Sequence, residues 1–396
     1  MKVLIISSYL PYPLFSGGQV RLYNLIKELS AKHEITLICE KRAHQTNSDI
    51  TEVKKICKHV ITVKRRRQWS ISNILKAGLS PHSFLITGHT NQVFKQKIQE
   101  TLNHNHFDVI HIETYYVTQN MPPTTLPIVL VDHNIEYQVY QKFMQRAPVF
   151  LRPFLKMDIS KIKREEEYFW KQASALIAVS REDQEIMKKV GCNPFLVANG
   201  VDTDKFTVKN FSKSNDAKEK KILFLGDFKW IQNRDAAIFI IKEIWPKIKE
   251  SGTIKLWIVG RKIPDSIKSL NSDASVFFDE ESSHLSTEKI FQKADVLLAP
   301  IRIGGGTSYK ILEAMSSGIP VVTMQMSADA LGAKDGEDIQ VGQTTTELAE
   351  KTLLLLEDDE LYRKISKNGR VLVEKNYTWK EIVKKLEEVY TKAMLY

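Results

Sequence analysis

The sequence has few cysteines and no long apolar run, and each shortage excludes a class of protein. Its 396 residues include only Cys39, Cys57 and Cys192, which predicts a reducing compartment without a disulfide framework or a zinc site. No apolar run approaches the roughly 20 residues of a membrane span. The four apolar residues at positions 3–6 are too few for the core of a signal peptide. We therefore expect a cytoplasmic protein.

Acidic residues are scarce relative to basic ones in the first half of the chain. Residues 1–200 contain 27 Lys+Arg and 17 Asp+Glu, whereas residues 201–396 contain 30 of each. The composition is otherwise ordinary for a soluble globular protein, with 43% hydrophobic and 26% charged residues. The formal net charge of +10 comes from the first half, so we expect only that half to meet an anionic partner.

Short β-branched runs alternate with helix-length stretches, a pattern typical of an α/β fold with parallel sheets covered on both faces. In the first half, strands are predicted at residues 3–6, 35–38, 60–63, 109–112, 128–131, 175–179 and 195–197. In the second half, they are predicted at residues 222–225, 256–259, 276–278, 296–299, 321–324 and 339–341. Two such series predict two Rossmann-like domains. Helical periodicity also predicts a helix at residues 159–172.

The break between the two series lies near residue 200. Asn199-Gly200-Val201-Asp202 closes the first series, and the polar, lysine-rich residues 207–220 indicate a linker or an exposed loop. Apolar residues recur at helical spacing from Trp379 onward. We therefore expect an N-terminal domain at residues 1–200, a second domain at 201–378 and a C-terminal helix at 379–396.

A glycine-rich segment between a predicted strand and a predicted helix is the most informative motif. Gly304, Gly305, Gly306, Thr307 and Ser308 precede the helix. The unpaired N–H groups and positive dipole of a helix start favour a phosphate, and glycine allows its close approach. The two hydroxyls suit an N-cap or a phosphate contact. The alternative interpretation is a simple glycine-rich turn.

Two weaker signals lie in the first half. Gly17 and Gly18 follow the first strand and precede a helix, so the same argument for an anion applies, with a plain turn as the alternative. His133 follows the strand at residues 128–131, at the edge where open α/β sheets bind ligands. It is placed to orient a substrate or move a proton, although taken alone this pattern favours a hydrogen-bonded loop histidine.

A basic segment in the first half carries much of the excess charge. Its interpretations are a solvated surface, an anionic membrane at the inner face of the cell, or an acidic acceptor, with the tryptophan as an interfacial anchor. No nucleic-acid motif accompanies it, so we expect no nucleic acid. Asp202-Thr203-Asp204 indicates a turn, and we expect no metal site. The basic segment consists of Lys54, Lys55, Lys58, Lys64, Arg65, Arg66 and Arg67, followed by Trp69.

In order and spacing, these motifs resemble glycosyltransferase family 4. The resemblance runs through Gly17-Gly18, the His133 loop, Asn199-Gly200-Val201-Asp202, the glycines after two strands (Gly226 and Gly260) and the segment at residues 304–315. It implies a GT-B fold, in which two Rossmann-like domains face each other across a cleft and a C-terminal helix crosses back to the first domain. It also implies retaining transfer of a sugar from a nucleotide diphosphate sugar.

The resemblance assigns a role to each matching residue. Glu313 corresponds to the glutamate that holds the ribose, and residues 304–308 correspond to the loop that presents N–H groups to the sugar and diphosphate. Gly17 and Gly18 correspond to a loop that closes on the diphosphate, and His133 to a histidine near the transferred sugar. Gly226 and Gly260 fall at donor-binding positions.

Two positions depart from the family pattern. Eight residues before Glu313, where the family often has a glutamate that grips the sugar, this chain has Gly305. The family also often has an arginine and a lysine aimed at the diphosphate. Here Lys229 and Arg234 are candidates of uncertain register, and Lys310 is a further candidate for that cation.

The resemblance therefore predicts a metal-independent, retaining glycosyltransferase with a UDP- or GDP-sugar as donor, no prosthetic group, and a glycan or glycolipid as acceptor. His133, Lys310 and Glu313 would carry the chemistry. Two alternatives stay open: a nucleotide-sugar epimerase on the same fold, and a non-catalytic relative that binds glycans or membranes.

Overall fold

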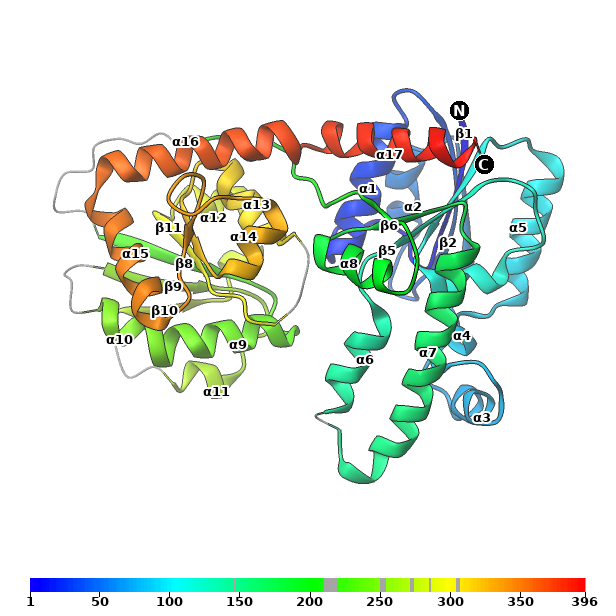
Figure 1. Ribbon diagram of the computed structural model, residues 1–396, viewed down its shortest axis with the longest axis horizontal. Coiled ribbons are helices and arrows are strands. Elements are labelled where there is room, and N and C mark those ends of the chain that lie inside the picture. Colours follow the sequence, from blue (N-terminus) through cyan, green and yellow to red (C-terminus); the bar gives the residue numbers. More distant parts are fainter. Residues whose placement is uncertain are drawn as a thin grey trace. The chain divides into compact units, whose positions relative to one another are not determined.

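The chain divides into two compact units in the computed structural model (Figure 1). Unit 1 comprises Met1–Ala198 and Ile382–Tyr396, and unit 2 comprises Asn199–Glu381. The structure describes residues 1–145, 147–209, 219–249, 254–270, 274–284, 286–303 and 307–395.

Unit 1 is built on a seven-stranded parallel sheet in the order β3-β2-β1-β4-β5-β6-β7. All seven strands predicted for this half are present. The five inner strands are short apolar runs that the sheet buries on both faces, whereas the edge strands β3 and β7 are only partly buried. Their bounds are β1 Lys2–Ser7, β2 Glu34–Lys41, β3 His59–Lys64, β4 Val109–Glu113, β5 Ile128–Asp132, β6 Ala175–Ala178 and β7 Phe195–Leu196.

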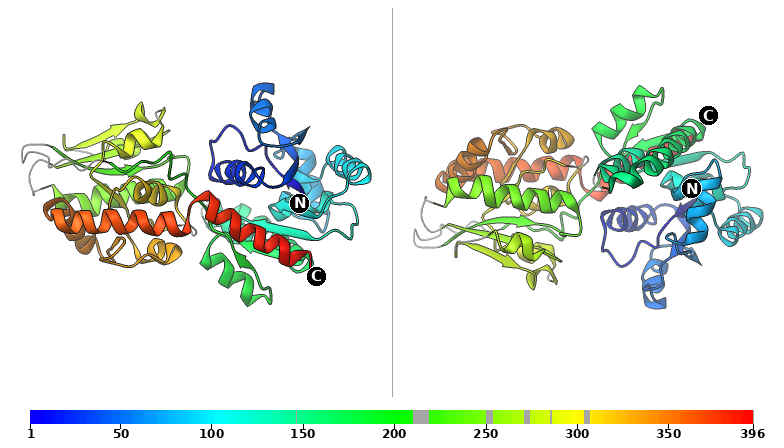
Figure 2. Two further views of the ribbon diagram at one scale, coloured as in Figure 1. Left: turned by 90° about the horizontal axis from the view of Figure 1, so that it is seen from above. Right: turned by 90° about the horizontal axis from the view of Figure 1, so that it is seen from below.

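Helices of unit 1 surround this sheet, as the two further views show (Figure 2). Side-chain caps set several of their starts: Ser16 accepts a hydrogen bond from the N–H of Gln19, and Ser180 accepts one from that of Asp183. The helices are α1 Gly17–Leu29, α2 Asn47–Lys54, α3 Ile71–Leu79, α4 Phe84–His89, α5 Gln92–His104, α6 Glu136–Met144, α7 Arg152–Gln172 and α8 Arg181–Lys189.

Unit 2 repeats the architecture with a six-stranded parallel sheet in the order β10-β9-β8-β11-β12-β13. The six predicted strands are present as β8 Lys220–Leu225, β9 Ile254–Val259, β10 Val276–Asp279, β11 Val296–Ala299, β12 Val321–Thr323 and β13 Gln340–Val341. Its helices are α9 Ile231–Phe239, α10 Trp245–Ile248, α11 Asp265–Lys268, α12 Thr287–Phe291, α13 Tyr309–Ser316, α14 Gln325–Leu331, α15 Thr345–Glu357 and α16 Asp359–Asn376.

Each sheet has one point where its strand order reverses. In unit 1 the reversal lies between β1 and β4, and in unit 2 between β8 and β11. Ligands of open α/β sheets bind outside the carboxyl ends of the strands at such a point. The loops that leave these four strands are therefore the first place to look for a site.

The chain passes from unit 1 to unit 2 earlier than the polar composition indicates. Phe206 is buried in unit 2, and the Lys209 ammonium lies 3.0 Å from the Asp295 carboxylate. Residues 207–209 therefore lie against unit 2 as a loop in which Thr207 and Val208 are exposed, which agrees with the exposed-loop alternative. The rest of the predicted linker, residues 210–218, lies outside the described residues, and the passage falls at Ala198–Asn199.

The last helix, α17 (Trp379–Ala393), joins both units. From Ile382 it belongs to unit 1, where Leu386 and Tyr390 are fully buried. Polar contacts fix it there: the Glu387 carboxylate lies 2.8 Å from Nε2 of His33, and the Tyr390 hydroxyl lies 2.6 Å from Nδ1 of His111.

Gly260 provides a test of packing at the carboxyl end of β9. A Cβ added there would lie 2.0 Å from the carbonyl oxygen of Gly226, which is backbone and cannot swing away. We predict that Gly260→Ala lowers the free energy of unfolding by about 1–3 kcal/mol. The matched control is Gly78→Ala in α3, where a Cβ meets no atom within 4 Å, and the gain in helix propensity should slightly raise stability. Equal melting temperatures for the two variants would contradict this account.

Candidate functional site

Lys310 lies at the carboxyl end of β8, at the reversal point of the unit 2 sheet. Its ammonium donates to Oδ1 of Asn233 at 2.7 Å and lies 4.6 Å from the centre of the Phe224 ring. The amide of Asn233 in turn donates to the carbonyl oxygen of Asp227 at 2.8 Å. Gly226 permits this arrangement, because a Cβ there would lie 2.6 Å from Cγ of Asn233. Asn233 thus holds Lys310, which the sequence analysis gives as a candidate for the cation that contacts the diphosphate.

Glu313 follows Lys310 by one turn of α13, and both side chains have strongly shifted pKa values. Burial raises the pKa of Glu313 to about 8 and lowers the pKa of Lys310 to about 7. Without a ligand, both groups therefore titrate near neutral pH. A charged ligand beside either would change its protonation, which is the behaviour expected of a binding site.

The start of α13 lacks a side-chain cap from its N-cap residue. Ser308 is its N-cap in extended backbone and makes no side-chain capping bond, so the first N–H groups of the helix are not capped by that side chain. The Thr307 hydroxyl is engaged, because it accepts from the backbone N–H of Asn199 at 3.2 Å. Gly304, Gly305 and Gly306, predicted to contact the donor, lie outside the described residues.

The other two predicted cations lie on the loop and helix that carry Asn233. Lys229 is exposed, and Nη2 of Arg234 donates to the carbonyl oxygen of Lys229 at 3.3 Å. Gly260 follows β9 and packs on the backbone of Gly226. The structure therefore brings Gly226, Lys229, Arg234 and Lys310 to one sheet edge.

In unit 1, the predicted residues Gly18 and His133 are neighbours. A Cβ on Gly18 would lie 3.6 Å from Cε1 of His133, and 2.9 Å from the Tyr9 hydroxyl. Gly17 begins α1 just before it, and His133 directly follows β5. Residues 115 positions apart in the sequence thus meet at the carboxyl edge of the sheet, where only glycine leaves this space.

A buried carboxylate that the motifs did not identify holds His133. Glu113, the last residue of β4, is fully buried and accepts from Nε2 of His133. Its other oxygen lies 3.0 Å from Nε2 of His111, whose Nδ1 contacts Tyr390 on α17. Burial alone would raise the pKa of Glu113, but the two histidines outweigh it and hold that pKa well below its usual range.

This network fixes the orientation of His133. A carboxylate that accepts from Nε2–H favours the imidazole form protonated at that nitrogen and prevents rotation of the ring. A sequence signal existed, because His111 and Glu113 are two residues apart on a strand and so share one face. Their partners His133 and Tyr390 are distant in sequence, and no local pattern joins them.

The structure divides the predicted basic segment instead of forming one patch. Lys54, Lys55 and Lys58 precede β3, whereas Lys64, Arg66, Arg67 and Trp69 lie at or beyond its other end. A strand of this length separates the two groups by roughly 20 Å. Lys55 and Lys58 also pair with Glu52 and Glu34.

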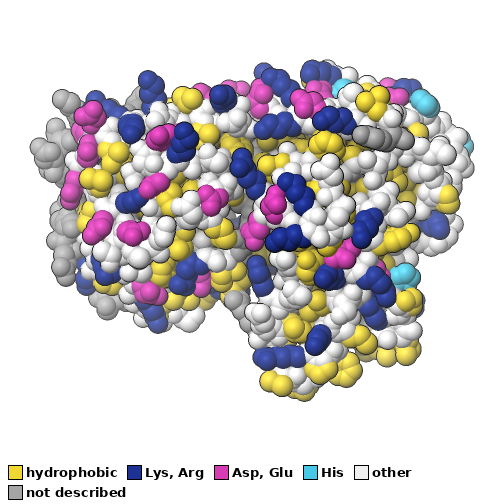
Figure 3. Space-filling model, in the orientation of Figure 1, with side chains coloured by type: hydrophobic (Ala, Val, Ile, Leu, Met, Phe, Trp, Pro, Cys, Tyr) yellow, Lys and Arg dark blue, Asp and Glu magenta, His cyan; other side chains and the backbone are white. Residues whose placement is uncertain are grey.

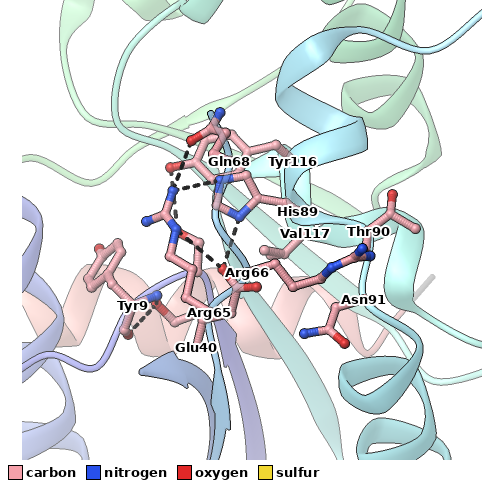
Figure 4. A network of polar contacts seen from close by, with 12 residues as sticks. Tyr9, Glu40, Arg65, Arg66, Gln68, His89, Thr90, Asn91, Tyr116 and Val117 are labelled. Atoms are coloured by element: carbon pink, nitrogen blue, oxygen red, sulfur yellow. Dashed lines mark hydrogen bonds and ion pairs between the residues drawn. The ribbon is translucent and has the colours of Figure 1, made fainter. Parts of the chain in front are cut away.

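Arg65 points into unit 1 (Figure 4). Its Nη2 lies 3.1 Å from Nε2 of His89 and 3.1 Å from Oε1 of Gln68. The Glu40 carboxylate accepts from Nδ1 of the same histidine at 3.0 Å. Arg65 therefore has protein partners for its charge, whereas Arg67 and Trp69 beside it are exposed.

Two searches of the described residues bear on metals and membrane spans. No group of three His, Cys, Asp or Glu side chains there is arranged to hold a metal ion. The Asp202 carboxylate accepts from the N–H groups of Asp204 and Lys205, as in a turn. None of the described helices combines the length and apolar character needed to cross a bilayer.

Comparison with known proteins identifies the class of protein. Residues 15–205 match the family model described as Glycosyltransferase Family 4, and residues 219–358 match the model described as Glycosyl transferases group 1. The phosphatidyl-myo-inositol mannosyltransferase of Mycobacterium tuberculosis is 23% identical over 320 residues, which cover 74% of this chain and 76% of that protein.

Solved structures agree on the fold. Sucrose-phosphate synthase from Thermosynechococcus elongatus has a TM-score of 0.73 at 15% identity and covers all of both chains. HepE from Anabaena in complex with UDP and glucose has a TM-score of 0.66 at 15% identity, with 99% of each chain covered. The fold is GT-B, as predicted. The chain belongs to the glycosyltransferase families that the two matching models define, and it is a glycosyltransferase.

The Glu113 network predicts how stability depends on pH. The pKa of Glu113 is lower in the folded state than the ordinary 4.5, so its contribution is present above that pH and is lost as the pH falls. We predict that Glu113→Gln lowers the free energy of unfolding by about 1.5–3 kcal/mol at pH 7. The difference from wild type should shrink below about pH 4.5. Urea unfolding between pH 3 and 7 measures it.

The control is Glu100→Gln, which removes an exposed carboxylate on α5 of the same unit. It should leave the pH dependence of unfolding unchanged. A Glu113→Gln curve that stays parallel to the wild-type curve over the whole range would show that the buried carboxylate is not held ionised by its histidines.

Proposed function

We propose that the protein transfers a sugar, with retention of anomeric configuration, from a nucleotide diphosphate sugar to an acceptor hydroxyl. The observation that carries this proposal is the grouping of Lys310, Glu313 and the start of α13 at the reversal point of the unit 2 sheet. The complex of the structurally similar HepE with UDP and glucose supports a nucleotide-sugar donor. Either a UDP- or a GDP-sugar fits the proposal.

The donor roles follow from charge. Glu313 would accept from the ribose hydroxyls, and the N–H groups at residues 304–308 would bind the diphosphate. Lys310 would neutralise the negative charge that develops on the leaving phosphate, with Lys229 and Arg234 as further cations. Fixed dipoles and a lysine of this kind stabilise a leaving group without a metal ion. Gly305 leaves the sugar hydroxyls without the carboxylate common in the family.

Unit 1 would supply the acceptor side. His133 would contact the transferred sugar, with its ring oriented by Glu113 as a positioning residue. Gly17 and Gly18 would leave room for the diphosphate beside it. The mannosyltransferase relative, whose name specifies a phosphatidyl-inositol substrate, supports a glycolipid or glycan acceptor. We also propose that the protein works in the cytoplasm, in contact with the anionic inner face of the membrane.

The direct test is an assay of purified protein with a panel of UDP- and GDP-sugars and a glycolipid extract, with products followed by mass spectrometry. We predict transfer from one donor, and a binding constant for that nucleotide weakened about tenfold or more in Glu313→Gln, because paired ribose hydrogen bonds to a charged group are lost. A donor epimerised in the absence of acceptor would instead indicate an epimerase. No turnover with any donor would favour a non-catalytic relative.

Proton uptake gives an independent test of Lys310. Its pKa of about 7 leaves it mostly neutral at pH 8, and a neighbouring diphosphate should raise that pKa and charge it. We predict that binding of the preferred nucleoside diphosphate at pH 8 takes up as much as about one proton more in wild type than in Lys310→Met. Calorimetry in buffers of different ionisation enthalpy measures this number.

The control is Lys367→Met, which removes an exposed lysine on α16 and should leave the proton count unchanged. Glu313 also titrates near pH 8, so the comparison with Lys310→Met isolates the lysine. Equal proton counts in wild type and Lys310→Met would remove the diphosphate role assigned to Lys310.

A further inference from the structure

Helix α3 exposes its large apolar side chains to solvent instead of packing them on the core. Asn73 and Ala77 are the buried side chains of α3. Its large apolar residues are exposed at positions i, i+3, i+4 and i+8, up to 90% for Leu79. Such a stripe normally faces the core. Here it faces solvent and includes Ile71, Ile74, Leu75 and Leu79.

A second exposed apolar group lies at the turn between α6 and α7. Val149 and Phe150 are each 73% exposed, and Phe154 is 69% exposed. The predicted helix at residues 159–172 omits this region, since α7 begins seven residues earlier, at Arg152. We call this group the tip; it comprises Phe143, Val149, Phe150, Leu151, Phe154 and Met157.

Specific contacts join α3 to the helix that carries the tip. The Lys161 ammonium on α7 donates to the carbonyl oxygens of Ala77 and Ser80 at 2.7 and 2.8 Å. The Asp158 carboxylate on α7 accepts from the N–H of Phe84 at 2.8 Å, and the Phe84 ring lies 4.8 Å from that of Trp69. Figure 1 shows α3 and the tip extending from the same end of unit 1.

The sequence segments that carry the two groups contain charges of one sign. No aspartate or glutamate occurs in residues 53–99 or in residues 137–157. Basic side chains accompany the apolar ones: Arg66, Arg67 and Lys76 beside α3, and Lys142, Arg152 and Lys156 beside the tip. Figure 3 shows apolar and basic side chains together at the lower end of unit 1, where α3 and the tip lie in Figure 1.

We propose that α3 and the tip form one surface that inserts into the headgroup region of an anionic lipid bilayer. An exposed apolar stripe whose own segment carries only basic charges fits a lipid surface, which has an apolar interior and negative headgroups. Trp69, 76% exposed beside α3, suits the boundary between the two. The inference deepens the membrane contact proposed above, and it assigns that contact to residues other than the lysines of α2.

The test is sedimentation of the full-length protein with vesicles of phosphatidylcholine alone or mixed with equal phosphatidylglycerol. Wild type should bind the mixed vesicles and not the neutral ones. Val149→Ser/Phe150→Ser and Leu75→Ser/Leu79→Ser should each weaken binding about tenfold or more, since apolar insertion is lost. Arg67→Gln/Lys76→Gln should weaken it by about tenfold to thirtyfold.

Matched controls lie elsewhere on the surface. Leu354→Ser/Val371→Ser removes two exposed apolar side chains from unit 2, and Lys54→Gln/Lys55→Gln removes two exposed cations from the last residue and the C-cap of α2. Both should bind mixed vesicles as wild type does. Circular dichroism and melting temperature establish that every variant is folded.

Three outcomes would overturn the proposal. The first is wild type that does not prefer anionic vesicles, and the second is an α2 variant that loses as much binding as the α3 variant. The third is a wild-type dimer that Val149→Ser/Phe150→Ser converts to a monomer without any vesicle binding, which would make this face an interface with a second copy. Because binding is measured without donor or acceptor, it can succeed or fail independently of transferase activity.

Discussion

The parallel arrangement of both sheets is the constraint on which the other features depend. Parallel strands place all their carboxyl ends at one edge, and a reversal of strand order leaves room there for loops of different origin. In unit 1 this edge gathers Gly18, His133 and Glu113, and in unit 2 it gathers Asn233 and Lys310. Residues far apart in sequence become neighbours because each lies at the end of a strand or in the loop or helix that follows a strand of the same sheet.

The sequence was informative where structure follows from local pattern. The thirteen strands were predictable, since each is a short apolar run between polar segments. The histidine at 133 directly follows a strand, and the glycine at residue 18 lies at the start of the helix after one. Glu113, His111 and Tyr390 were not recognised as a network, because their contacts join positions as far as 279 residues apart. The basic segment looked continuous because a count of charges does not use the strand predicted at residues 60–63, which separates its two ends.

Burial of Glu113 shows why every contact of this network is needed. A buried carboxylate is costly unless its oxygens are paired, and here each oxygen contacts a histidine. His111 in turn contacts a hydroxyl on α17. The orientation of His133 at one edge of the sheet therefore depends on a helix from the other end of the chain. Helix α3 differs from Glu113, because its apolar residues recur at the spacing of a buried helix face and yet the fold leaves them exposed to solvent.

The division of the chain has a consequence for biosynthesis. Unit 1 is not contiguous, because its final piece, Ile382–Tyr396, is separated from the rest by the whole of unit 2. On the ribosome, the first sheet emerges long before Tyr390 can reach His111 or Glu387 can reach His33. The first sheet therefore lacks the packing of α17 until nearly two hundred further residues have been added. A truncated product that ends within unit 2 would therefore lack a finished copy of either unit.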